Sequence, residues 1–224
     1  MTLSLLARCP ETLQFGMVIA SSSPAVAARC AHARAGVGVA ASQNITDPAL
    51  GPALLDLLAK GQTAPQAMLS VVKATPHMAH RQLMLVDAQG NTAFHSGTGV
   101  LGIWAVAQGM NTIAGGNMLA NLAVPQAMVD AHLSTKGPFG DRLIAALQAG
   151  RDAGGEAGPL HSSGMLVVDK LSWPIVDLRC DWTDDCPVET LAATWRIYQP
   201  QMHAYVQRAQ DPTQAPSYGV PGDP

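Results

Sequence analysis

The chain begins Met-Thr, and this pair could carry chemistry. Methionine aminopeptidases generally remove an initial Met when the next residue is small, which would leave Thr2 with a free α-amine. That amine has an unperturbed pKa of about 7.7–8.0, so it can act as a base at neutral pH. Threonine activated by its own amine is a known type of nucleophile. The alternative is that Thr2 is an ordinary strand residue.

The segment GGNML, residues 115–119, could stabilise a developing negative charge. Its glycines leave backbone N–H groups accessible, and the Asn117 amide adds a donor, so we expect Gly116 and Asn117 to form an oxyanion hole. The alternative is a turn before a helix, with Asn117 as the helix cap.

Three further polar residues lie at predicted strand ends and are candidates for substrate binding. Gln43 and Asn44 close an apolar strand and point toward a loop, and the alternative is turn chemistry. His95 follows a later strand, and the alternative is a structural histidine.

Metal and cofactor motifs are not recognisable. His77 and His80 stand at i and i+3 without an acidic partner in register, so we expect no metal site. The glycines of 154–158 lack the Lys and Ser/Thr of a phosphate loop, and no dinucleotide motif is present, so we expect no cofactor. The four cysteines have no CxxC spacing and are expected to be reduced core thiols.

The composition narrows the class of protein. Of 224 residues, 48% are hydrophobic and 13% are charged, which is enough for a large core. The net charge of −3 and the lack of a basic stripe argue against a nucleic-acid partner. The first residues lack a basic n-region, Arg8 interrupts the early apolar run, and no membrane-length apolar run occurs, so we expect a cytoplasmic protein. We also expect a homo-oligomer.

The hydrophobic pattern predicts an α+β fold. Strands are expected in hairpins, and several are apolar on both faces, which indicates two antiparallel sheets packed together with helices outside. The arrangement that satisfies both is a four-layer αββα sandwich. The predicted strands cover 2–8, 14–22, 36–43, two segments within 82–97, 102–109, 111–117, 164–170 and 174–181.

Predicted helices show recognisable start and stop signals. Asp47 and Pro48 are expected to start one helix that Gly61 ends, and Thr63 with Gln66 has capping-box spacing. Further helices are predicted over 122–134, 139–149 and 183–198. We expect one domain over 2–210, followed by a Pro/Gly-rich tail over 211–224.

Several segments together resemble DUF1028, a family of uncharacterised bacterial and archaeal proteins. They are MTLSLLAR, FGMVIASSS, ARAGVGVAASQ, DPALGPALLDLLAKG, QLMLVDAQGNTAFHSG, GGNML, GDRLIAALQAGRDAGG and PIVDLRCD. That family is assigned to the N-terminal-nucleophile (Ntn) hydrolase superfamily. The resemblance implies an αββα sandwich and hydrolysis of an amide bond by the N-terminal residue.

The resemblance also suggests roles for two residues. In Ntn folds the end of the second strand lies beside the nucleophile, so Ser21 could hold the amine or relay a proton; the alternative is a hydroxyl satisfying backbone groups. Proteasome-like members use a cation near the third strand, so Arg34 could supply charge or bind a substrate carboxylate; the alternative is a surface arginine. Relatives tend to read GGD-x-RG-x-QSA where this chain reads GGEAGPLHSSG, which replaces Asp with Glu156 and lacks the Arg.

The expected function is therefore an amidohydrolase with Thr2 as nucleophile, and with Ser21 and Asn117 as further catalytic residues. Its substrate would be a small polar amide, for example an N-acyl or N-carbamoyl compound with a carboxylate that meets Arg34. The alternative is a non-catalytic protein that keeps the fold and binds a small molecule.

Overall fold

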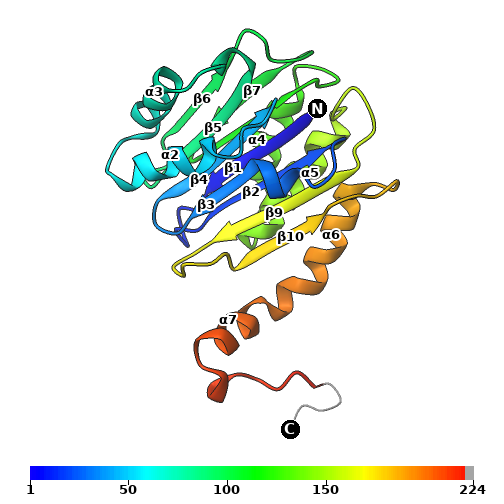
Figure 1. Cartoon of the computed structure of the whole chain (residues 1–224). Coiled ribbons are helices and arrows are strands. Elements are labelled where there is room, and N and C mark those ends of the chain that lie inside the picture. The colour runs from blue at the N-terminus through cyan, green and yellow to red at the C-terminus, as the bar shows by residue number, and fades with distance from the viewer. Residues whose placement is uncertain (220–224) are drawn as a thin grey trace.

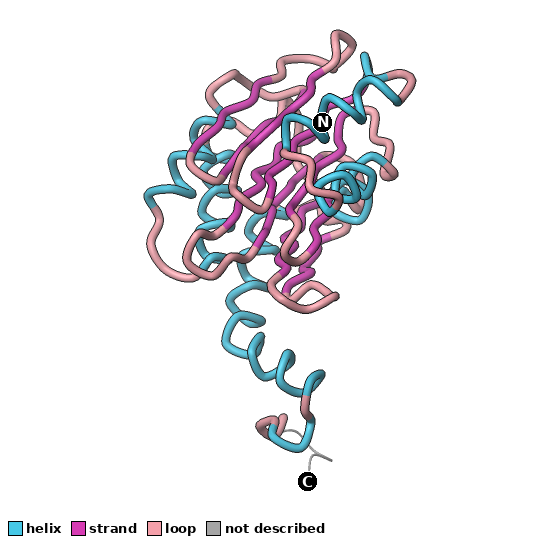
Figure 2. The backbone as a smooth tube through the Cα atoms, turned by 90° about the vertical axis from the view of Figure 1, so that its left-hand side faces the viewer, coloured by secondary structure: helices cyan, strands magenta, loops and turns pink. Residues whose placement is uncertain are grey.

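A computed structural model describes residues 1–219, and within it two antiparallel sheets lie face to face. One sheet has the strand order β10-β9-β2-β1-β8-β7 and the other has the order β3-β4-β5-β6. Helices lie on both outer sides of the paired sheets (Figure 1, Figure 2). The predicted α+β, four-layer αββα architecture is confirmed.

The strands are β1 (Thr2–Arg8), β2 (Phe15–Ser21), β3 (Ala31–Arg34), β4 (Gly38–Asn44), β5 (Arg81–Asp87), β6 (Thr92–Ser96), β7 (Ala105–Gly109), β8 (Thr112–Asn117), β9 (Ser162–Val168) and β10 (Val176–Cys180). The α-helices are α1 (Val26–Cys30), α2 (Leu50–Ala59), α3 (Ala64–Ala74), α4 (Val124–Ser134), α5 (Phe139–Asp152), α6 (Pro187–Tyr198) and α7 (Met202–Gln210).

The layers follow from alternation along the strands, which sends successive side chains to opposite faces of a sheet. In β1, Leu3 and Leu5 face a core formed with α4, α5 and α6, whereas Leu6 faces the other sheet. In β5, Leu83 packs against α2 and α3, whereas Met84 faces β1. Three apolar cores therefore separate the four layers, and β1 is buried along nearly its whole length.

Local signals set most helix boundaries. Thr63 and Gln66 form the predicted capping box at the start of α3. Gly61 follows α2 with a φ of 88°, which a residue without a Cβ adopts easily. The predicted N-cap at Asp47 is wrong, because α2 begins at Leu50. The Asp47 carboxylate instead accepts a hydrogen bond from the Ala49 N–H and closes the turn before the helix.

Some elements differ from the sequence prediction. The pattern does not predict α1, β3 or α7, and β9 begins earlier than expected, at Ser162. None of the residues of α7 is fully buried, and Met202 and Val206 are only partly buried against the core, so this helix carries a weak core pattern. It projects away from the sandwich, at the end opposite the N-terminus (Figure 1, Figure 2).

The domain assignment stays a prediction. The two sheets and α1 to α6 share the three cores, and the single domain proposed over 2–210 would add α7 to them. Of the predicted tail over 211–224, the structure describes the part up to residue 219, which includes a short 3-10 helix at Pro212–Gln214. Residues 220–224 lie outside the described residues.

Candidate active site

Polar side chains replace apolar ones at one end of the layer between the two sheets. At this end β1 begins, β2, β4 and β8 end, and β5 begins. On the face between the sheets, the buried polar residues that these strands contribute at this end are Thr2, Ser4, Ser21, Gln43, Gln82 and Asn117. Burying polar groups is costly unless they are hydrogen-bonded, so such a concentration needs a structural or functional reason.

Thr2 is the first residue of β1, paired with Asn117 of β8 on one side, and its side chain is buried. The hydroxyl groups of Thr2 and Ser21 both donate a hydrogen bond to the carbonyl oxygen of Met1. Ser21 in turn accepts a hydrogen bond from the Ser23 N–H at 3.0 Å, which helps to orient its side chain. Two of the predicted catalytic hydroxyls therefore meet at one carbonyl group.

A chain of amide side chains connects the two sheets behind Thr2. The Ser4 hydroxyl donates to Gln43 Oε1 at 2.9 Å, and Gln43 Nε2 donates to Gln82 Oε1 at 2.8 Å. Asn117 Nδ2 donates to the same Gln82 oxygen at 3.1 Å, while Gln82 Nε2 donates to the Gly116 carbonyl at 3.1 Å. We call Ser4, Gln43, Gln82 and Asn117 the amide network; it holds the Asn117 amide in a fixed orientation.

The GGNML segment lies beside Thr2, as a strand end rather than as a turn that caps a helix. The N–H groups of Met118 and Leu119 already donate to the carbonyls of Leu101 and Ile103, so they are not free oxyanion donors. Asn117 retains a second side-chain N–H, and its Oδ1 is buried without a hydrogen-bond partner. Gly116 is needed for packing, since a Cβ there would lie 2.6 Å from the Thr2 carbonyl oxygen.

Glu156 is a site residue that the sequence reasoning did not select. It is 5% exposed, and its Oε2 accepts a hydrogen bond from the Ser22 N–H at 3.2 Å, next to Ser21. Its Oε1 is buried and has no partner in the described structure. Burial raises the pKa of Glu156 to about 7, and the nearby positive charge of the chain's N-terminal amine acts in the opposite direction.

A cavity of about 320 Å³ adjoins this position. Glu156, Asp184 and Asp185 line it together with Gly158, next to which the Met1 side chain lies. Arg151 also lines the cavity, but its guanidinium pairs with Asp152 and Glu189. The cavity therefore has an excess of negative charge beside the N-terminus.

Arg34 does not lie near Thr2. It is at the end of β3, pairs with Asp56 of α2 at 2.8 Å, and lines a separate cavity with Val168. In the pairing of β2 with β9, Val168 is opposite Phe15 and Ser162 is opposite Ser21. The cavity of Arg34 and the Ser21 side chain are therefore six residues apart along these strands. At roughly 3.3 Å per residue this is about 20 Å.

Asn44 borders the amide network, but both ends of its side chain are occupied. Its Nδ2 donates to the His80 carbonyl at 2.7 Å, and its Oδ1 accepts from the Leu101 N–H at 3.2 Å. The backbone of Asn44 has a φ of 73°, a conformation that asparagine tolerates. In this structure Asn44 fixes two loops rather than facing open space.

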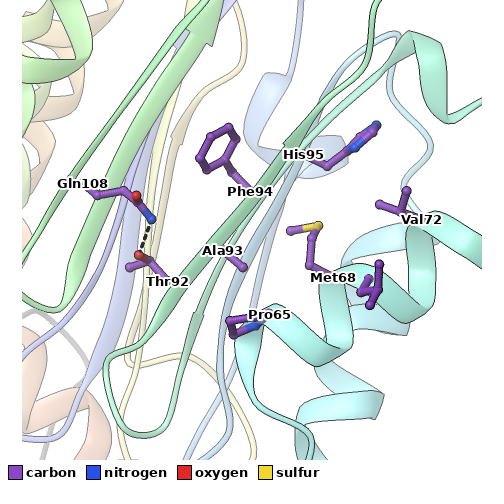
Figure 3. Close-up of a pocket in the computed structure, with 9 residues that line it drawn as sticks. Pro65, Met68, Val72, Thr92, Ala93, Phe94, His95 and Gln108 are labelled. Atoms are coloured by element: carbon purple, nitrogen blue, oxygen red, sulfur yellow. Dashed lines mark hydrogen bonds between the residues drawn. The ribbon is translucent and has the colours of Figure 1, made fainter.

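His95 faces the opposite side of the four-stranded sheet from Thr2. Its Nε2 hydrogen-bonds the Met78 carbonyl at 2.8 Å, and it lines a mainly apolar cavity of about 390 Å³ between α3 and β6. Figure 3 shows His95 beside Met68 and Val72 in this pocket. Of the eight predicted site residues, the structure brings together Thr2, Ser21, Gln43, Gly116 and Asn117, with Asn44 at the border.

The missed residues differ in how far their sequence signals could have revealed them. Ser4 and Gln82 occupy positions that alternation assigns to the face between the sheets, so a polar residue within LSLLA or before LMLV was a usable signal. Glu156 lies in a glycine-rich loop, whose path sequence periodicity does not predict.

Among residues 1–219, no group of three or more His, Cys, Asp or Glu side chains is arranged to hold a metal ion. No helix in the same range is long and apolar enough to cross a membrane.

Comparison with known proteins places the chain in a family. The chain matches DUF1028, a family of unknown function, over residues 2–191. A crystal structure of a DUF1028 protein from Silicibacter pomeroyi is 31% identical, with a TM-score of 0.83, and the match covers 88% of this chain and 89% of that chain. None of the curated proteins compared with the chain matches it significantly.

Two further solved structures are remotely similar. Eukaryotic HslV from Trypanosoma brucei is 11% identical with a TM-score of 0.44, covering 75% of this chain and 99% of that chain. Anbu, an ancestral beta-subunit, from Yersinia bercovieri is 14% identical with a TM-score of 0.41, covering 91% and 97%. The family match spans β1 to α6 and includes Thr2, Asn117 and Glu156, so the chain belongs to the DUF1028 family.

Proposed function

We propose that the protein is an N-terminal-nucleophile amidohydrolase in which Thr2, freed by removal of Met1, is the nucleophile. The observation that supports this most directly is the meeting of the Thr2 and Ser21 hydroxyls at the Met1 carbonyl. A hydroxyl that already contacts a carbonyl oxygen at the head of a buried strand is held close to where an acyl group would react.

The reaction would proceed in two balanced stages. The Thr2 α-amine accepts the hydroxyl proton while Oγ1 attacks the amide carbon, and the leaving amine then takes that proton as the C–N bond breaks. Water attacks the resulting ester, the α-amine again accepts a proton, and the Thr2 hydroxyl is restored as the acid leaves. The sum is the amide plus water, giving an acid and an amine, without a cofactor.

The surrounding residues would support these stages. Once Met1 has been removed, the Ser21 hydroxyl, which the Ser23 N–H helps to orient, can donate to a substrate carbonyl as it now donates to that of Met1. The second N–H of Asn117 is the candidate oxyanion donor, and Gln82 restricts the orientation of that amide. One such donor is typically worth roughly 10²–10³ in rate.

The substrate remains a small polar amide, but the carboxylate expected to meet Arg34 loses its support. Arg34 pairs with Asp56 and lies about 20 Å along the strands from the level of Ser21, by the spacing of roughly 3.3 Å per residue. A substrate at Thr2 therefore does not reach it. An N-carbamoyl or N-acyl group needs no carboxylate and fits the reaction equally well.

The first test is the intact mass of protein expressed without a tag. A mass lower by one methionine residue is expected, because Thr2 is small enough for Met1 to be removed. A chain that retains Met1 has the Thr2 amine, which is the proposed base, blocked in a peptide bond, and that result would overturn the proposal.

The second test compares variants at position 2. With a panel of chromogenic amides, Thr2→Ala should lose turnover while Thr2→Ser, which keeps a hydroxyl and a small side chain, should retain it. Full activity of Thr2→Ala would exclude this mechanism. Turnover by none of the three proteins, with ligand binding unchanged by Thr2→Ala, would instead favour a binding protein that keeps the fold.

A further inference from the structure

Met1 occupies a space that is matched to each of its parts. Its carbonyl oxygen accepts hydrogen bonds from Thr2 and Ser21. Its side chain lies against Gly158, where an added Cβ would come within 3.3 Å of the Met1 methyl carbon. The positive charge of its amine opposes the rise in the pKa of Glu156, although the Oε1 atom of that carboxyl has no hydrogen-bond partner. The chain's own methionyl group is therefore a bound aminoacyl group.

This position also indicates where a substrate's acyl group would lie. Met1 is an acyl group on the Thr2 nitrogen, whereas an acyl-enzyme intermediate carries its acyl group on Thr2 Oγ1. The two atoms belong to one residue and are separated by two carbon atoms, Cα and Cβ. Once Met1 has been removed, an acyl group on Oγ1 therefore enters the space that Met1 leaves, with Gly158 and Glu156 as neighbours.

Glu156 gives that space a chemical preference. Its Oε1 is buried without a partner, and no lysine or arginine in the described part of the chain contributes to its pKa. A buried carboxylate without a counter-charge is costly, because no nearby positive charge offsets the loss of its hydration. Removal of Met1 moves the chain's amine back by one residue, to Thr2, where it must be neutral to act as the base. The position that the Met1 ammonium leaves therefore favours a ligand that restores a positive charge there.

The adjoining cavity reinforces this preference. Asp184 and Asp185 line it with Glu156, while the charge of Arg151 is shared between Asp152 and Glu189. The Gly158 wall leaves room for a side chain of methionine size. Ligands with a negative charge at this position would meet three carboxylates and are disfavoured.

We propose that the processed protein hydrolyses amides whose acyl group carries a protonated α-amine, and that Glu156 is the residue that selects this amine. The inference rests on the proposed function and specifies its substrate class. Thr2 Oγ1 forms an ester with the aminoacyl carbon as the amide C–N bond breaks, the leaving amine gains the proton, and water releases the free amino acid. Acyl groups with a blocked amine are poor substrates.

The test uses chain shown by its mass to lack Met1, with methionyl p-nitroanilide and N-acetylmethionyl p-nitroanilide as matched substrates. A charge-assisted hydrogen bond predicts a kcat/KM about 10- to 100-fold higher for the free amine. Glu156→Gln, which keeps the shape and removes the charge, should reduce this ratio to about 1 to 3, by the same reasoning. Glu156→Asp should retain most of the preference. Equal rates for both substrates, or an unchanged ratio in Glu156→Gln, would overturn the inference.

A binding measurement separates this inference from the proposed function. Processed Thr2→Ala should bind methioninamide in calorimetry at least about 10-fold more tightly than N-acetylmethioninamide, and Glu156→Gln should abolish the difference. Turnover of blocked and free amides alike would leave the hydrolase standing and reject the amine site. Binding of methioninamide that depends on Glu156, without any turnover, would support the amine site and reject the hydrolase. Thermal unfolding of each variant establishes that it is folded.

Discussion

Two regions on opposite sides of the four-stranded sheet differ in their chemistry. Toward the helices, α3 and β6 enclose about 390 Å³ of mainly apolar space, in which His95 is already hydrogen-bonded to a backbone carbonyl. Toward the other sheet, Gln43 and Gln82 support the region around Thr2, where Asn117 Oδ1 and Glu156 Oε1 are buried without partners. The histidine of the apolar pocket has a hydrogen-bond partner, whereas two buried polar atoms near Thr2 have none.

This difference shows which feature marks a candidate site. Apolar space next to a satisfied histidine can result from the loose packing of a surface helix. Buried polar atoms without partners cost free energy, so their convergence is better evidence for chemistry than cavity size. The comparison predicts that substitutions at the N-terminal region change turnover, whereas substitutions in the α3–β6 pocket do not.

The largest effect is expected at Thr2. Thr2→Ala should lower kcat by about 10⁴-fold or more, because it removes the attacking atom. The matched control is Met68→Ala in the α3–β6 pocket, and its kcat should stay within about twofold of the wild-type value. This change can still cost about 2–5 kcal/mol in the free energy of unfolding, as Met→Ala does in a core. Comparable losses of kcat in both variants, measured below their unfolding temperatures, would contradict the comparison.

Gly116→Ala tests whether the close contact of β8 and β1 positions Thr2. The new Cβ would lie 2.6 Å from the Thr2 carbonyl oxygen, which is backbone and cannot swing aside. Overpacking of this kind costs about 1–3 kcal/mol in the free energy of unfolding, and kcat should fall as well. The control is Gly115→Ala, whose Cβ meets the flexible Met84 side chain at 2.8 Å and should cost less in urea unfolding.

Glu156 should make stability depend on pH. Its folded pKa of about 7 lies above the ordinary value of 4.5, so the folded state binds this proton more tightly than the unfolded state. The resulting stability is fully present below pH 4.5 and is lost as the pH rises through 7. The charged groups around it are the N-terminal amine, Arg151, Asp184 and Asp185.

The size of this effect is up to about 3 kcal/mol between pH 5 and pH 8, because each tenfold change in proton affinity is worth about 1.4 kcal/mol. The difference between wild type and Glu156→Gln in urea unfolding at the two pH values isolates it from the other carboxylates. If both proteins lose stability equally over this range, the Glu156 carboxyl does not titrate near neutral pH.

The smallest effect is expected at His95. His95→Gln keeps a group that can donate to the Met78 carbonyl, and the hydrogen bond at stake is worth only about 1 kcal/mol. We therefore expect kcat, and the ratio of kcat/KM for free and blocked amines, to change by less than about twofold. A larger loss of kcat would mean that the α3–β6 pocket communicates with Thr2. Steady-state kinetics on both p-nitroanilides measures this.

The sequence allowed more of the fold to be predicted than of the site. Strand alternation and helix signals such as the Thr63 capping box are local, and they led to the αββα layers. Thr2 and Asn117 were selected because glycine-rich and N-terminal motifs have recognisable chemistry, and the structure places them side by side. Arg34 was selected because of its place in the chain, but a strand's length separates it from the level of Ser21.

By itself, the sequence determined the layers of this protein, the identity of Thr2 as the first residue of a buried strand, and the polar residue types at the strand ends. The tertiary structure decided which of these residues meet. Glu156 reaches Ser22 across 134 positions of the chain through a loop without periodicity, and Gln82 joins Gln43 and Asn117 because β4, β5 and β8 end or begin at the same level. Local propensity contains no information on such long-range contacts, since they depend on how the two sheets pack.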